Sequence, residues 1–127
     1  MNPPYAKDLC HRFIKKLLES YAANEVTEAI VLVNNATETG WLQPLLKACS
    51  AVCFPFGRIR FLDQQGLALS PLQGQAVVYL GMAVDDFRKQ HDDLGAVLIG
   101  GANNRSAQAV ARALSQHYCS ARIRRTA

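Results

Sequence analysis

The run Ala29-Ile30-Val31-Leu32-Val33 decides the fold, because consecutive aliphatic and β-branched residues favour a β-strand. The run has no polar alternation, which predicts a strand covered on both faces of its sheet. An amphipathic segment over residues 6–23 precedes it, and a helix followed by a buried strand is half of a doubly wound α/β unit. The apolar stripe expected on that helix consists of Leu9, Phe13, Ile14, Leu17, Leu18 and Tyr21.

Further elements follow this unit in the same alternating order. We expect a helix over residues 41–48, with Pro44 in its first turn, and a short strand over 51–54. Residues 57–62 alternate in period two and 75–81 form a second apolar run, so we expect the two to pair antiparallel at the edge of the sheet. A short helix over 85–92, a strand over 96–99 and a last helix over 106–118 complete the prediction. The predicted fold is α/β, a small mixed β-sheet with helices on its faces.

Composition indicates one globular domain over residues 1–127. The chain is 50% hydrophobic, which is enough to bury a core. Its formal charge of +4 is mildly basic and permits a polyanionic partner such as DNA. No acidic residue follows Asp93, so the positive excess belongs to the C-terminal segment. We expect Arg122, Arg124 and Arg125 to bind nucleic acid or an acidic protein surface, although short basic tails are often only solvated.

The cysteine spacing argues against a metal site or disulfides. Cys49 and Cys53 lack the second pair of ligands that zinc needs, so we expect reduced thiols in the core, with Cys10 and Cys119. The sequence has no secretory signal and no apolar run of about 20 residues, the length of a membrane span. We therefore expect no metal, no membrane and a location in the bacterial cytoplasm.

The residues Asn2-Pro3-Pro4-Tyr5 are suited to holding an exocyclic amine. The Asn2 side-chain oxygen and the Pro3 carbonyl both accept hydrogen bonds, and the prolines stiffen the backbone that carries them. Tyr5 offers a ring on which a base swung out of its stack can lie. Two prolines after an asparagine are also common in ordinary turns and tails, so the motif alone does not decide the function.

Other candidate site residues follow the first strand. Thr37 and Thr39 lie at its carboxyl end, where open α/β sheets bind ligands, but either is equally suited to capping the next helix. Trp41 suits packing at a helix start better than a ligand platform. Arg58 and Arg60 fall on one face of the expected hairpin and suit phosphate contacts, although strand arginines more often protect a sheet edge.

Four ordered blocks of sequence together resemble the C-terminal half of the bacteriophage and prophage DNA N6-adenine methyltransferases. The blocks are residues 2–5 (NPPY), 30–41 (IVLVNNATETGW), 57–61 (GRIRF) and 73–81 (QGQAVVYLG), within a methyltransferase-like half over residues 2–97. Residues 103–127 lie outside the pattern and form an extra basic helix and tail.

The resemblance implies a Rossmann-like sheet, S-adenosylmethionine as cofactor and methyl transfer to adenine N6 in DNA. Asn2 and Pro3 would polarise the amine, and Tyr5 would stack on the base. Thr37, Thr39 and Trp41 would line the site, with Arg58 and Arg60 beside the nucleic acid. The reaction needs no strong base, because the amine need only be held with its lone pair toward the methyl sulfonium.

The resemblance also predicts a truncated enzyme. In the family, the glycine-rich cofactor loop precedes the loop that matches residues 2–5, so we expect a protein that does not methylate alone and binds the cofactor poorly. A permuted order, with residues 98–103 as the cofactor loop, is a weaker alternative because the glycine spacing is incomplete. The alternative function is a catalytically inactive remnant that binds nucleic acid or protein, such as a phage inhibitor of host defence machinery.

Truncation would also leave a sheet edge open beside Ile30. We expect a homodimer or a rebuilt edge there, with residues 96–99 filling the vacant position.

Overall fold

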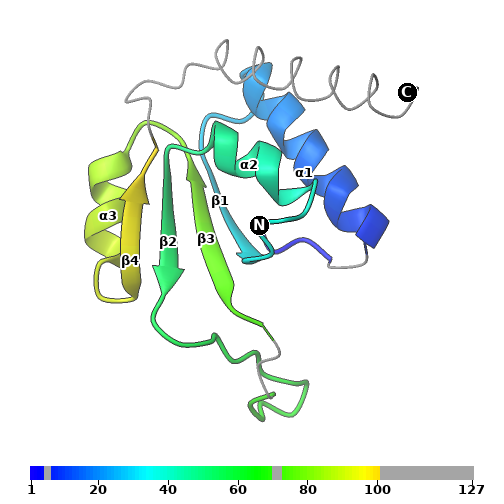
Figure 1. Cartoon of the computed structure of the whole chain (residues 1–127), viewed down its shortest axis with the longest axis vertical. Helices are drawn as coiled ribbons and strands as arrows, with labels where there is room; N and C mark the ends of the chain where they lie inside the picture. The colour runs from blue at the N-terminus through cyan, green and yellow to red at the C-terminus, as the bar shows by residue number, and fades with distance from the viewer. Residues whose placement is uncertain (5–6, 70–72, 101–127) are drawn as a thin grey trace.

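The computed structural model describes residues 1–4, 7–69 and 73–100, which form a small α/β domain (Figure 1). Its elements match most of the predicted helices and strands in kind and position. The predicted helix over 106–118, Cys119 and the basic tail lie outside the described residues. The elements are α1 (Lys7–Ala22), β1 (Ala29–Asn34), α2 (Leu42–Ala48), β2 (Ala51–Pro55), β3 (Gln75–Leu80), α3 (Val84–His91) and β4 (Gly95–Ile99).

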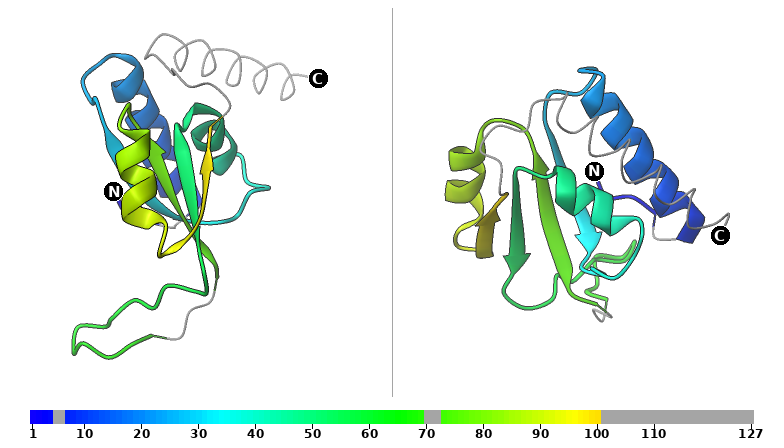
Figure 2. Two further views of the ribbon diagram at one scale, coloured as in Figure 1. Left: turned by 90° about the vertical axis from the view of Figure 1, so that its left-hand side faces the viewer. Right: turned by 45° about the horizontal axis from the view of Figure 1, so that its top comes forward.

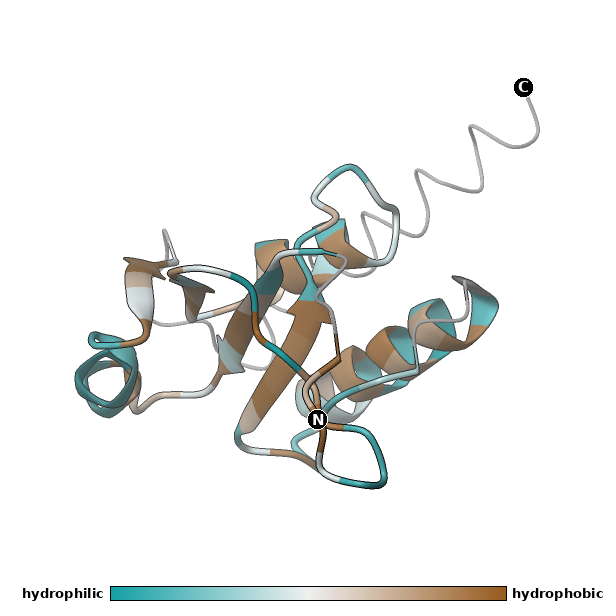
Figure 3. Cartoon of the chain, turned by 90° about the horizontal axis from the view of Figure 1, so that it is seen from below, coloured by the Kyte–Doolittle hydropathy of each residue, from teal (hydrophilic) through white to brown (hydrophobic). Residues whose placement is uncertain are grey.

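The strands form a four-stranded sheet in the order β1-β3-β2-β4, in which every neighbouring pair is antiparallel. Because β1 and β2 both run antiparallel to β3, they point the same way and their carboxyl ends lie at one end of the sheet. Helices α1 and α2 cover one face, and α3 covers the other (Figure 2). The helix ribbons carry hydrophilic residues on their outer sides, while the central strands are hydrophobic (Figure 3).

Strand β3, rather than β1, is covered on both faces along its whole length. All of β3 is buried, whereas β1 buries Val31 and Val33 and leaves Ile30 42% exposed. Strand β1 lies at the edge of the sheet, and α3 packs on β2 and β4 rather than on β1. The prediction for β1 was therefore wrong about its second face, since a run of aliphatic residues does not reveal which helices cover it.

Helix α1 buries a narrower stripe than the sequence pattern indicates. Ile14, Leu18 and Tyr21 are buried as predicted, and Cys10 joins them one turn earlier. The prediction was wrong for Leu9 and Phe13, which are 42% and 47% exposed. Leu9 and Phe13 lie beside the stripe of α1 that contacts the sheet, and no other described element covers them.

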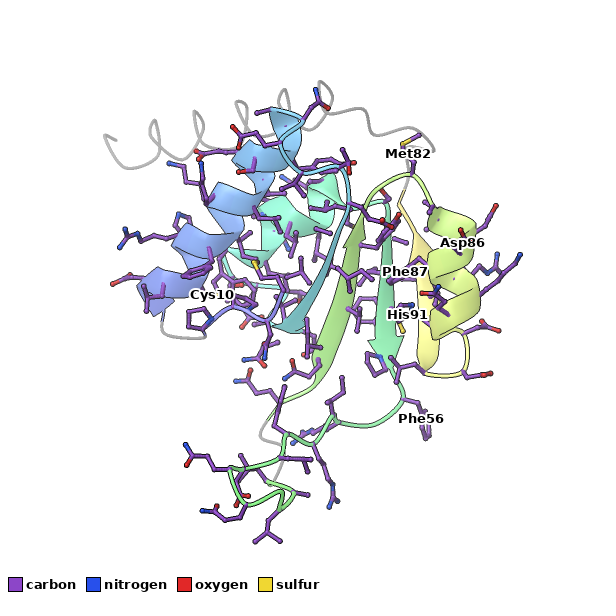
Figure 4. The ribbon with its side chains drawn as sticks, turned by 180° about the vertical axis from the view of Figure 1, so that it is seen from behind. Cys10, Phe56, Met82, Asp86, Phe87 and His91 are labelled. Atoms are coloured by element: carbon purple, nitrogen blue, oxygen red, sulfur yellow. The ribbon has the colours of Figure 1, made fainter. Side chains whose placement is uncertain are left out.

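The three described cysteines are core thiols, as expected. Cys10, Cys49 and Cys53 are buried and unbridged, and Cys10 faces the sheet from α1 (Figure 4). Burial raises the pKa of the Cys10 and Cys53 thiols, which keeps them protonated and poorly reactive.

Two predictions about strand pairing were wrong. Residues 57–62 form no strand, and β3 pairs with β1 and β2 in the centre of the sheet instead of with 57–62 at its edge. Strand β4 pairs with β2 at the edge far from β1, so it does not fill the position beside Ile30.

Candidate functional site

Met1 lies along the outer edge of β1 and directs the segment after it. The Met1 amino group donates a hydrogen bond to the Ile30 carbonyl, and the Leu32 amide donates to the Met1 carbonyl at 2.8 Å. Two bonds that flank Val31 in this way are the pattern of parallel strands. Asn2 and Pro3 therefore continue toward the carboxyl end of β1.

The amine-binding candidates differ in exposure. Asn2 is exposed, whereas Pro3 is buried and Pro4 is exposed again. Pro3 therefore anchors this segment to the domain surface between two exposed residues. Tyr5, the predicted stacking ring, lies outside the described residues.

The loop after β1 closes on itself. The Thr39 hydroxyl donates to the Ala36 carbonyl at 2.7 Å, and the Gln43 side-chain amide donates to the Thr37 carbonyl. Trp41 occupies the N-cap of α2, and no side chain caps the helix, so the capping prediction for Thr37 and Thr39 was wrong. Trp41 is partly buried and packs against the core, which confirms the prediction that it is a packing residue.

Side-chain amides gather at the carboxyl end of β1, a feature that sequence reasoning missed. The Gln75 amide donates to the Asn34 side-chain oxygen at 2.6 Å, and the Asn35 backbone amide donates to the Gly74 carbonyl at 3.1 Å. A Cβ atom on Gly74 would lie 2.8 Å from the Asn35 side-chain nitrogen. The paired asparagines directly after a strand were the available signal. Asn34 and Asn35 join the end of β1 to the start of β3.

Residues 56–69 form an arm that extends from the same end of the sheet (Figure 1). Its tip is a turn built on Asp63, whose carboxylate accepts from the amides of Gln65 and Leu67 at 2.9 and 2.8 Å. The Leu69 amide donates to the Phe61 carbonyl at 2.7 Å, which holds the two sides of the arm together. The arm thus has local structure although it forms no strand of the sheet.

The arm presents aromatic, aliphatic and cationic side chains to solvent. Phe56 is 98% exposed and points away from the domain (Figure 4), and Leu67 is 67% exposed. Arg58 and Arg60 are also exposed. Exposed apolar side chains that gather on one segment in this way make the arm a candidate contact surface.

The opposite end of the sheet carries a buried tyrosine that is structural. The Tyr79 hydroxyl donates to a Glu28 carboxylate oxygen at 2.8 Å and accepts from the Ala83 amide at 2.9 Å. Burial, with the hydrogen bond to Glu28, raises the pKa of Tyr79 to about 12. The Tyr79 ring also stacks on the ring of Phe87 in α3, and Phe87 stacks on His91 of the same helix (Figure 4). The Tyr79 hydroxyl therefore both donates and accepts a hydrogen bond inside the domain.

The remaining site predictions are only partly covered by the structure. Arg122, Arg124 and Arg125 lie outside the described residues. Within residues 1–4, 7–69 and 73–100, no group of histidine, cysteine and acidic side chains is arranged to hold a metal ion. No helix in that part of the chain is long and apolar enough to cross a membrane.

Comparisons with known protein families, with curated proteins and with solved structures gave no match to this chain.

Proposed function

We propose that the chain is a nucleic-acid-binding domain of the DNA adenine-N6 methyltransferase type, which holds the amine of an extruded adenine at Asn2 and Pro3. The observation that carries this proposal is the parallel alignment of Met1 with β1. That alignment directs the acceptor loop to the end of the sheet at which β1 and β2 finish, which is also the end from which the arm extends.

The chemistry of the loop favours a base amine. An amide oxygen and a proline carbonyl accept hydrogen bonds without offering a competing proline N–H, so a donor such as the adenine N6 amine is the matching partner. The buried Pro3 keeps the backbone in place, which lowers the entropy that binding must overcome.

The arm supports nucleic acid as the partner. Arg58 and Arg60 supply positive charge for phosphates, and Phe56 supplies an exposed ring for stacking. The arm leaves the carboxyl end of β2, so it extends from the end of the sheet that carries Asn2. The two features together suit a distorted or single-stranded DNA site.

We limit the proposal to base binding, because the two glycines beside β3 do not offer the open backbone that a glycine-rich cofactor loop gives S-adenosylmethionine. The glycines at the two ends of β3 leave no open cradle: an added Cβ on Gly74 would meet Asn35, and one on Gly81 would meet the Tyr79 hydroxyl at 2.5 Å. Methyl transfer would require a partner chain that supplies the cofactor site. Transfer of tritiated methyl groups to DNA by this chain alone would contradict that statement.

Fluorescence anisotropy with labelled oligonucleotides tests base binding. We expect a duplex with one unpaired adenine to bind about three to ten times more tightly than the same duplex with N6,N6-dimethyladenine, which has no N–H to donate. Asn2→Ala should reduce that difference, because only the Pro3 carbonyl then remains to accept from the amine, and it should leave the salt-dependent part of the affinity unchanged. Equal affinity of the wild-type protein for the two oligonucleotides would rule out the assigned contact.

A second function, protein binding by the arm, rests on a separate observation. Leu62, Leu67 and Leu69 are at least half exposed, at 66%, 67% and 50%, and aliphatic side chains contribute little to phosphate recognition. Such a surface suits an apolar patch on another protein, as expected of an inactive remnant that inhibits a host enzyme. In this case Leu67→Ser would abolish partner binding and leave DNA affinity intact.

A further inference from the structure

Strand β4 forms the second edge of the sheet, and its hydrogen-bond pattern shows which backbone groups face outward. The Gly100 amide donates to the Ser50 carbonyl at 2.7 Å, and the Phe56 amide donates to the Leu94 carbonyl at 2.9 Å. Residues alternate in direction along a strand, so Ala96 and Leu98 also point their amides and carbonyls toward β2. The N–H and C=O groups of Gly95, Val97 and Ile99 therefore face away from the sheet.

Within its described residues, β4 has none of the side chains that normally prevent strand pairing. Edge strands are usually protected by charged side chains, proline or a bulge, and β4 has only glycine, alanine and aliphatic residues. The other edge differs, because Met1 bonds to Ile30 and Leu32 of β1. Of the two edges, β4 is the one suited to accept another strand.

We propose that β4 pairs antiparallel with β4 of a second copy of this chain, around a two-fold axis at Val97. In this register Val97 faces the partner's Val97, and Gly95 faces the partner's Ile99. In each of these pairs the two facing residues form two backbone hydrogen bonds with each other. The three outward-facing residues of one copy would thus form about six hydrogen bonds with those of the other. The two sheets would join into one continuous sheet.

Side-chain sizes favour a second copy over an unrelated strand. The two-fold register places a small residue opposite a large one at each step: Gly95 opposite the partner's Ile99, and Ala96 opposite the partner's Leu98. Leu98 and Ile99 are 55% and 42% exposed and lie on opposite faces of the strand, so each face gains an apolar contact. A strand that complements itself under two-fold symmetry is what an isologous dimer interface requires.

Sedimentation velocity over about 5 to 300 μM tests the proposal with the full chain, because edge pairing buries little area and gives modest affinity. We expect a concentration-dependent dimer. Ile99→Pro removes an outward N–H and keeps the bonds to β2, and it should weaken association at least about tenfold. Ile99→Val is the matched control and should associate as the wild type does. A second variant, Ile99→Lys, places a charge at the edge without changing the backbone and should also give monomers.

Amide hydrogen exchange on the wild-type chain distinguishes a second copy from other occupants of the edge. We expect the Val97 and Ile99 amides to become protected as protein concentration rises. Protection that does not depend on concentration would assign the edge to residues 101–127 of the same chain and overturn the proposal. A monomer at every concentration, or a dimer that Ile99→Pro and Ile99→Lys leave intact, would overturn it as well.

Discussion

Tyr79 shows how much a single side chain depends on contacts that a local pattern cannot reveal. Its run of aliphatic neighbours correctly predicts a buried strand, but its hydroxyl donates to Glu28, 51 residues away in the chain. Burying a hydroxyl without a partner costs about 1 to 3 kcal/mol, so this bond decides whether a tyrosine is tolerated there. The same limit applies to Gln75 and Asn34, whose contact spans 41 residues.

The raised pKa of Tyr79 predicts a loss of stability at alkaline pH. The unfolded chain loses the tyrosine proton near the ordinary value of 10, whereas the folded protein keeps it until about pH 12. Between these values the unfolded state binds fewer protons, so the free energy of unfolding falls as pH rises from about 10 to 12, and it is unaffected by this group below about 10. Urea unfolding at a series of pH values measures the slope.

Two variants isolate the contribution of this group to the pH dependence. Tyr79→Phe should remove its part of the slope and lower stability at pH 7 by about 1 to 3 kcal/mol, because the Ala83 amide loses its acceptor. Glu28→Gln keeps a hydrogen-bond acceptor and removes the negative charge, so the fall should still begin near pH 10 but end at a lower pH and be smaller in total than in the wild type. An unchanged slope in both variants would contradict the assignment.

At the scale of elements, the sequence predicts whether a segment is a helix or a strand. It predicts less well which other elements lie beside that segment. The runs in β1 and β3 look alike, yet only β3 is buried on both faces, because it lies between two strands while β1 lies at an edge. The alternation over residues 57–62 is as regular as that of a strand, but those residues find no partner in the sheet and become part of the arm. Pairing partners and covering helices are properties of the whole fold, so local periodicity does not specify them.

The close approach of β4 to β2 predicts a strict requirement for glycine at position 95. A Cβ atom there would lie 2.1 Å from the Phe54 carbonyl oxygen, which belongs to the backbone and cannot move aside easily. Gly95→Ala should therefore lower the free energy of unfolding by about 2 kcal/mol or more. Gly40→Ala is the matched control, since nothing lies within 4 Å of its added Cβ, and it should change stability by less than about 0.5 kcal/mol. Equal effects in urea unfolding would show that β2 and β4 are not in this contact.

At the scale of the whole molecule, the two candidate contact regions lie at one end of the sheet. The sequence predicted Asn2, Arg58 and Arg60 as site residues from their chemistry, and β1 and β2 bring their segments to the same end because the two strands run in the same direction. That common direction depends on β3 lying between them, which the predicted edge hairpin did not include. The polar pair Asn34 and Gln75 was missed for the same reason, since it forms only when β3 pairs with β1.

The position of the arm predicts how DNA affinity responds to salt. Each phosphate that a cation neutralises contributes about −0.9 to the slope of log K against log salt for duplex DNA, so replacing both Arg58 and Arg60 by alanine should reduce its magnitude by about 1 to 2. Arg88→Ala is the control, because Arg88 lies on α3 beside Asp85 and Asp92, where a phosphate would be repelled. Fluorescence anisotropy from about 25 to 300 mM salt measures the slopes. If the Arg88 variant changes the slope as much as the double variant does, DNA binds by diffuse charge attraction and the arm has no special part in it.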